Sequence, residues 1–203
     1  MSIAGLLVSF GFLIIAMTVH EFAHGWVAYR LGDSTAKYSG RLTLNPLAHI
    51  DPLGTVIIPL LLFITTRGQF VFGAAKPIPI NYLALRNPKK GIVWIGASGP
   101  FANFALAIVF GLLYRIAPEE PIISFICQGM IYVNVVLGIF NLIPIPPLDG
   151  SRILMGLLPQ KMSSRYAMLE PYGFFIIVAL IGLGLFDLAI LPLVRIALGL
   201  LGV

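Results

Sequence analysis

Long runs of apolar residues alternate with polar stretches along this chain of 203 residues. A helix needs about 20 residues to cross the hydrocarbon core of a bilayer. The first three of five apolar runs reach that length, and the last two are shorter. The pattern therefore predicts an all-α polytopic membrane protein with about five transmembrane helices. The five runs cover residues 3–29, 91–116, 121–143, 171–186 and 188–202.

The connection between the first two spans contains a further apolar run at residues 53–66, with Pro59 near its middle. This run is too short for a full crossing, so we expect a re-entrant or shallow segment. Alternating residues at 40–44 and 70–72 predict short strands nearby. Pro77 and Pro79 cannot donate ladder hydrogen bonds, which indicates an edge strand or an extended loop. An edge strand beside the site could pair with an unwound substrate segment. A solvated connecting loop is the slightly favoured alternative.

The composition favours a lipid environment. Of the residues, 59% are hydrophobic and 10% are charged, with a mean hydropathy of +0.98, whereas soluble domains carry roughly a quarter charged residues. The first run is too long for a cleaved signal peptide and lacks a basic segment before it. The single cysteine, Cys127, excludes an internal disulfide. The basic residues lie between the apolar runs, where membrane orientation explains them without nucleic-acid binding.

The first apolar run contains the sequence HEFAH at residues 20–24. His20 and His24 are four positions apart, so a helix presents both imidazoles on one face, where they can bind one zinc ion. Glu21 is then the candidate general base toward water at the metal. Ionisable side chains in a membrane helix persist mainly when they are paired, bind metal or line a wet cavity. Three of them within five positions favour a metal site over helix packing.

A zinc site of this type needs a third ligand at the same depth in the membrane. The best candidate is Asp149, just beyond the run that ends at residue 143. Asp149 emerges on the same side as His24 only if residues 53–66 do not cross the bilayer, and we therefore predict that they do not. As an alternative, Asp149 would be a plain N-cap of the helix that follows the prolines at 144–147.

Two asparagines and a third histidine are further candidates. Asn103 lies within a span, after the small residues of GASG at 96–99, which favour close helix packing. Its amide needs a polar partner in the bilayer, and it can either face the metal cavity or tie two helices together. Asn141 precedes the proline-rich break and could be only a local backbone partner. His49 could be another ligand, although hydrogen bonding within its loop is the favoured interpretation.

The distribution of charge orients the predicted molecule. Basic residues outnumber acidic ones in residues 30–90, whereas the opposite connection holds Arg115 with Glu119 and Glu120. The positive-inside rule places the basic connection in the cytoplasm. The zinc site would then open toward the cytoplasm.

These motifs together resemble the site-2 protease family of intramembrane zinc metalloproteases, and in particular its compact prokaryotic members. The resemblance runs from His20 to about Arg152. It rests on HEFAH in a membrane helix, on the pattern from Gly99 to Asn103, and on NLIPIPPLDG at 141–150. The segments NPLAHIDPLG at 45–54 and AKPIPIN at 75–81 also look like those of the family.

The resemblance implies a location in a prokaryotic cell membrane and one zinc ion per chain, bound by His20, His24 and Asp149. It implies Glu21 as general base, with Asn141 near the substrate backbone or the developing oxyanion. Asn103 is a second candidate for that contact. We expect a single membrane-embedded metalloprotease domain over residues 1–203, with a core at 3–152 and accessory C-terminal helices at 153–203. No PDZ or CBS module is recognisable.

The expected function is that of a zinc-dependent intramembrane endopeptidase. It would hydrolyse peptide bonds in or near transmembrane segments of membrane-protein substrates. The alternative is a membrane zinc-binding or zinc-transport protein that uses the same ligands. The lack of internal repeats and of further His or Asp residues along a path counts against that alternative. A non-catalytic scaffold would have no need of Glu21. The sequence specifies no oligomeric state.

Overall fold

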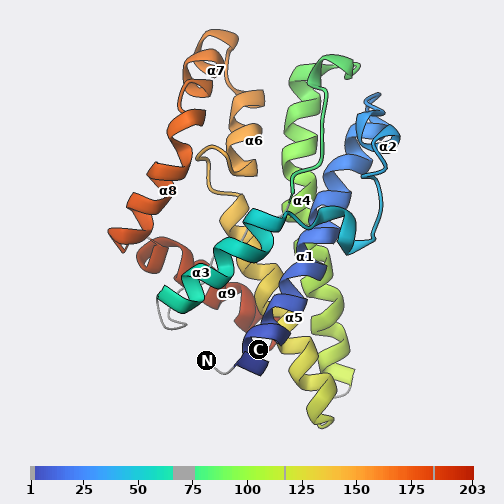
Figure 1. Cartoon of the computed structure of the whole chain (residues 1–203), viewed down its shortest axis with the longest axis vertical. Coiled ribbons are helices and arrows are strands. Elements are labelled where there is room, and N and C mark those ends of the chain that lie inside the picture. The colour runs from blue at the N-terminus through green and yellow to red at the C-terminus, as the bar shows by residue number, and fades with distance from the viewer. Residues whose placement is uncertain (1–2, 66–75, 117, 185) are drawn as a thin grey trace.

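The computed structural model describes residues 3–65, 76–116, 118–184 and 186–203. Within them the fold is helical and contains no strand. Three long helices, α1 (Ile3–Arg30), α4 (Pro88–Ile116) and α5 (Pro121–Asn141), pack together as the main bundle (Figure 1). The predicted all-α polytopic membrane fold is thereby confirmed. Four stretches of the described chain are long and apolar enough to cross a membrane: Leu7–Arg30, Pro88–Ile116, Pro121–Asn141 and Gln160–Gly182.

In its described residues, the polar connection between α1 and α4 contains short helices and no strand. These are α2 (Thr35–Tyr38) and the 3₁₀ helices η1 (Pro46–His49) and η3 (Tyr82–Ala84). The strand predicted at 40–44 was wrong. Gly40 has a φ of 68°, and the amides of Arg41 and Leu42 both bind the carbonyl of Ala36, so the backbone turns back on α2. The strand predicted at 70–72 lies outside the described residues.

The short apolar run forms a π-helix, η2 (Pro52–Ile57), followed by α3 (Ile58–Thr65). These elements have 6 and 8 residues, less than the length of a full crossing. In Figure 1 α3 lies obliquely to α1 and α5 instead of running alongside them. None of the four described stretches that are long enough to span a membrane includes α3.

Two successive helices, α5 and α6 (Asp149–Leu157), pack one after the other along α4. The ring of Phe104 on α4 lies against Gly138 of α5, whereas Gly96 lies against Arg152 and the backbone of α6. The prolines at 144–147 separate α5 from α6 because proline cannot continue a helix. This break leaves the start of α6 beside the middle of α4.

The C-terminal part returns to the bundle. It comprises α7 (Gln160–Ala167), η4 (Glu170–Tyr172), α8 (Gly173–Gly182), η5 (Phe186–Ile190) and α9 (Leu191–Leu201). The last predicted run corresponds to η5 and α9, and α9 has only 11 residues. Val194 of α9 is buried with Ala107 of α4 and Ile131 of α5 in one apolar cluster. The start of α1 and the end of α9 both lie in the lower part of the view in Figure 1.

Candidate metal centre

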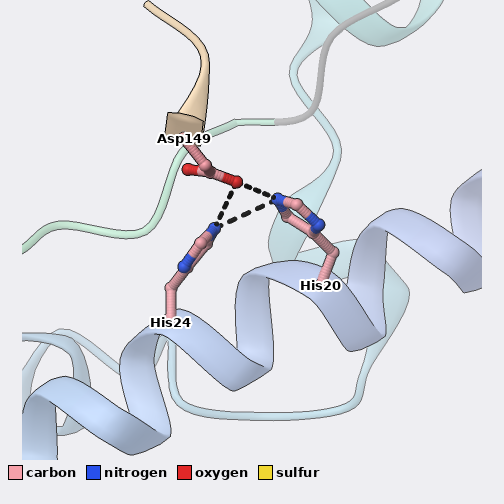
Figure 2. Close-up of side chains that lie close together, drawn as sticks. All are labelled: His20, His24 and Asp149. Carbon is pink, nitrogen blue, oxygen red and sulfur yellow. Dashed lines mark hydrogen bonds and ion pairs between the residues drawn. The ribbon is translucent and has the colours of Figure 1, made fainter. Parts of the chain in front are cut away.

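The two histidines of HEFAH lie on the face of α1 that packs against α4. Both are buried, with 6% of each residue exposed. Their Nε2 atoms are 3.0 Å apart. Figure 2 shows both rings projecting from neighbouring turns of α1 toward the same point. The spacing of four residues therefore produces a convergent pair of nitrogen atoms.

Asp149 approaches this pair from the first turn of α6 (Figure 2). Its Oδ2 is 3.0 Å from Nε2 of His20 and 3.2 Å from Nε2 of His24. The side chain of Asp149 is 16% exposed. The three residues form one cluster of possible metal ligands in the described part of the chain.

The other ring nitrogens of the histidines are bound by α4. Nδ1 of His24 is 2.6 Å from the backbone carbonyl of Ile95, which can only accept, so this Nδ1 carries the proton. Nδ1 of His20 is 2.6 Å from Oδ1 of Asn103 and likewise donates. In the neutral imidazole this leaves Nε2 of each ring without a proton and directed toward Asp149, which is the form that binds a metal ion.

The donor atoms fit a zinc ion. Two Nε2 atoms and one carboxylate oxygen converge, and in the neutral imidazoles each offers a lone pair to a cation. Oδ2 of Asp149 is buried and has no hydrogen-bond donor within the described residues. A buried, unpaired oxygen is costly unless a cation binds it. Ligands of a tetrahedral zinc site lie about 3.3 Å from one another, which is close to the observed separations of 3.0 to 3.2 Å.

Gly99 provides the space for the two imidazoles. A Cβ at this position would lie 2.5 Å from Nε2 of His24 and 2.6 Å from Cε1 of His20. Gly96, one turn earlier, makes the corresponding space for α6, where a Cβ would lie 3.0 Å from the carbonyl oxygen of Asp149. The sequence suggested helix packing for these glycines. In the structure these glycines allow the candidate ligands on α1 and the one on α6 to approach each other across α4.

Asn103 lies behind His20, fully buried, and does not line the cavity. Its Nδ2 donates to the carbonyl of Ala16 at 3.2 Å and to Oδ1 of Asn134 at 2.8 Å. Of the two alternatives, the structure favours the tie between helices and corrects the candidate contact with substrate. Sequence reasoning missed Asn134, although an amide in the middle of the span at 121–143 was a signal.

Glu21 shares a cavity of about 330 Å³ with the three candidate ligands. The backbone N–H of Ile78 donates to Oε2 of Glu21 at 2.8 Å. Asn141 lines the same cavity, and its Nδ2 donates to the carbonyl of Leu137 at 3.0 Å. His49 lies elsewhere and contacts the carbonyl of Thr43 at 2.8 Å, as expected for a loop hydrogen bond.

The extended segment 76–81 forms one wall of the cavity and is held at three points. Arg41 donates to the carbonyl of Lys76 at 2.7 Å, Glu21 binds Ile78, and Oδ2 of Asp33 accepts from the N–H of Asn81 at 2.7 Å. Asp33 is 1% exposed. Asp33 and Arg41 could not be singled out from the sequence, because each binds a backbone group far away in the chain.

Tyr82 and Arg152 complete the polar lining and were also missed. Burial raises the pKa of the Tyr82 phenol above its ordinary value, so the hydroxyl stays protonated and can donate a hydrogen bond. Arg152 pairs with Glu170 at the edge of the cavity. The cavity is thus lined by a neutral hydrogen-bond donor, Tyr82, and by a cation that already has a partner, Arg152. These lie beside the carboxylates of the cavity.

Known proteins match this chain over most of its length. A family model described as Peptidase family M50 matches residues 116–181. YwhC of Bacillus subtilis, by its name a candidate zinc metalloprotease, is 39% identical over 177 residues, or 83% of this chain and 77% of YwhC. Rip2 of Mycolicibacterium smegmatis, similarly named, is 32% identical over 171 residues, or 83% of this chain and 64% of Rip2.

A more distant match is the regulator of sigma-E protease RseP of Escherichia coli. It is 33% identical over 109 residues, which are 52% of this chain and 24% of RseP. No solved structure gives a significant match. The identity to YwhC over most of both chains shows that this chain belongs to peptidase family M50, the site-2 protease family of zinc metalloproteases.

Proposed function

We propose that this zinc metalloprotease is an intramembrane endopeptidase that cleaves membrane proteins in or near their transmembrane segments. His20, His24 and Asp149 bind one zinc ion per chain, and Glu21 is the general base. The observation that carries the proposal is the convergence of three ligand atoms, 3.0 to 3.2 Å apart, on a helix able to span a membrane. Glu21 lies in the same cavity.

The roles of the protein groups follow from their positions. Zinc, when bound, acts as a Lewis acid that acidifies water and polarises a carbonyl oxygen. The carboxylate of Glu21, which Ile78 holds at the cavity, takes the proton of the attacking water and returns it to the leaving amine. Asn141 uses one amide hydrogen for Leu137, and its second is the proposed donor to the developing oxyanion.

The segment 76–81 is the proposed binding site for the substrate backbone. Pro77 and Pro79 have no N–H, and the N–H of Ile78 is taken by Glu21. The N–H and carbonyl of Ile80 have no partner within the described residues, and Ile80 lines the cavity. A substrate segment that has lost its helical hydrogen bonds can pair with these groups as a strand pairs with an edge. Helix-breaking residues near the cleaved bond are the expected consequence.

The proposed orientation follows from charge. Basic residues dominate the connection that contains α2 and segment 76–81, so this side faces the cytoplasm of a prokaryotic cell. The cavity lies beside segment 76–81. It therefore opens toward the cytoplasm, from which water reaches the buried site.

The test uses the purified protein in liposomes with a transmembrane peptide that contains helix-breaking residues. Glu21→Gln should bind zinc normally and cleave about a thousandfold more slowly, whereas Asp149→Ala should lose zinc. Glu119→Gln, in the connection between α4 and α5, is the matched control and should cleave normally. Chelation should abolish cleavage, and added zinc should restore it.

Two outcomes would contradict the proposal. Retained cleavage by Glu21→Gln would remove the general base from the mechanism. Zinc flux into the liposomes, unaffected by Glu21→Gln and without any cleavage, would favour the zinc-transport alternative.

A further inference from the structure

The loop that presents Asp149 is contacted on its outer side by residues 166–173, here called the C-terminal clamp. The clamp comprises the end of α7, the short helix η4 and the first residue of α8. The hydroxyl of Tyr166 donates to the carbonyl of Pro144 at 2.5 Å. Glu170 forms an ion pair with Arg152, one turn after Asp149. The two contacted residues, Pro144 and Arg152, therefore lie on either side of Asp149 in the sequence.

The closest contact is made by Gly173, which is buried against the backbone of the loop. A Cβ at Gly173 would overlap the carbonyl oxygen of Pro146 and would lie 3.1 Å from the nitrogen of Pro147. The backbone of Gly173 is helical, with φ −57° and ψ −42°. Glycine is therefore not needed for its conformational freedom. It is needed because α8 begins in direct contact with the loop.

The side chain of Asp149 depends on its backbone for its position. Apart from the two histidine nitrogens that it faces, Oδ2 has no partner within the described residues. The loop also folds back on itself, because Gly150 lies against the carbonyl oxygens of Leu142 and Ile143. The clamp adds contacts from a later segment of the chain. A displacement of the loop there would move Oδ2 away from the histidines.

We propose that the C-terminal clamp positions Asp149 for zinc binding, with Gly173 as its principal positioning residue. The proposal rests on the ligand role proposed for Asp149. It makes residues 166–173 part of the construction of the metal centre, although none of them is among the three candidate ligands. It also means that a movement of α8 changes the affinity for zinc.

The principal test compares two glycine substitutions in α8. Gly173→Ala introduces the overlap with Pro146, whereas a Cβ at Gly182 meets nothing within 4 Å. Zinc affinity is measured on the full-length protein in detergent by competition with a chromogenic chelator. The absorption spectrum of bound Co²⁺ reports the ligand geometry. Gly173→Ala should bind zinc at least about tenfold more weakly, with an altered Co²⁺ spectrum. Gly182→Ala should match the wild type in both measurements.

A milder pair of variants decides the question if Gly173→Ala does not fold. Tyr166→Phe removes only the hydroxyl that binds Pro144, and about threefold weaker zinc binding is expected. Tyr172→Phe is its control, because the Tyr172 side chain is exposed and its hydroxyl has no hydrogen bond within the described residues. Melting temperatures measured without metal separate a local effect on zinc from a general loss of stability.

The outcomes distinguish this proposal from the proposed function. Wild-type zinc affinity and Co²⁺ spectra in both Gly173→Ala and Tyr166→Phe would overturn the clamp and leave the protease intact. If Gly173→Ala does not fold, wild-type values for Tyr166→Phe alone overturn the clamp. Wild-type zinc affinity in Asp149→Ala would instead overturn the ligand assignment on which both proposals depend.

Discussion

His20 and His24 project from an uninterrupted helix of 28 residues, whereas Asp149 begins a helix of 9 residues directly after a proline-rich break. The second nitrogen of each histidine is bound by a group on α4, at 2.6 Å in both cases. The ligand oxygen of Asp149 has no such partner among the described residues. The two sides of the metal centre are thus held by different means.

The difference shows how the two sides of the proposed zinc site are held where two structural segments meet. On the histidine side, hydrogen bonds fix the ring orientation and tautomer before metal binds. On the aspartate side, close backbone contacts at Gly96 and Gly150 fix the loop, and the carboxylate follows. We therefore expect steric changes to affect both sides, and changes in hydrogen bonding to affect the histidines more.

The largest effect is expected from Gly99→Ala, which acts on both histidines at once. The added methyl would lie 2.5 to 2.6 Å from the two rings, so the rings or the helices must move. Zinc affinity should fall about a hundredfold, as measured by chelator competition. Gly11→Ala, where a Cβ meets nothing within 4 Å, should leave zinc affinity unchanged. Normal zinc binding by Gly99→Ala would show that the histidine side adapts more readily than its hydrogen bonds suggest.

A smaller effect is expected from Asn103→Ala, which acts directly on only one of the two histidines, His20. The substitution removes the acceptor of the Nδ1 proton of His20 and leaves the contact between His24 and Ile95 in place. Zinc affinity should fall about tenfold, and the Co²⁺ spectrum should show the change in ligand geometry. Asn103→Asp keeps an acceptor at this position and should retain more of the affinity. Equal losses in both variants would mean that Asn103 acts through packing alone.

Much of this centre could be predicted from the sequence, because its strongest signals are local or topological. The spacing of His20 and His24 is a local property of a helix. Asp149 followed from the requirement for a ligand at the same depth, which also excluded a crossing by residues 53–66. Both arguments use only residue spacing and span length.

The remaining features depend on contacts between distant segments. The N–H of Ile78 binds Glu21, 57 positions away, and the carboxylate of Asp33 binds Asn81, 48 positions away. A backbone donor has no residue-specific signature, so neither contact could be predicted. The expected strand at 40–44 failed for a related reason, since alternation favours a strand only where another strand is available for pairing.

Removal of zinc should separate the two sides without any substitution. With the metal gone, hydrogen bonds to α4 still hold both histidine rings, whereas the Asp149 carboxylate keeps only its contacts with the two histidine nitrogens. Amide hydrogen exchange should therefore accelerate at residues 148–151 and change little at residues 16–28 of α1. Mass spectrometry before and after chelation measures both regions in one sample. Equal acceleration in α1 would contradict the preorganised histidine side.

The smallest effect on zinc is expected from Asn134→Leu, which removes the second link behind His20. Oδ1 of Asn134 accepts from Asn103 at 2.8 Å, so its loss leaves one buried N–H of Asn103 without a partner. Such a loss costs about 1 kcal/mol of stability within a membrane protein, whereas the contact of Asn103 with His20 persists. The melting temperature should fall while zinc affinity changes no more than about twofold. Gln128→Leu, at an exposed hydrogen-bonding position of the same helix, is the control and should change neither quantity. A loss of zinc affinity as large as that of Asn103→Ala would mean that the orientation of His20 depends on both asparagines. The hydrogen bond between Asn134 and Asn103 would then matter as much as the one between Asn103 and His20.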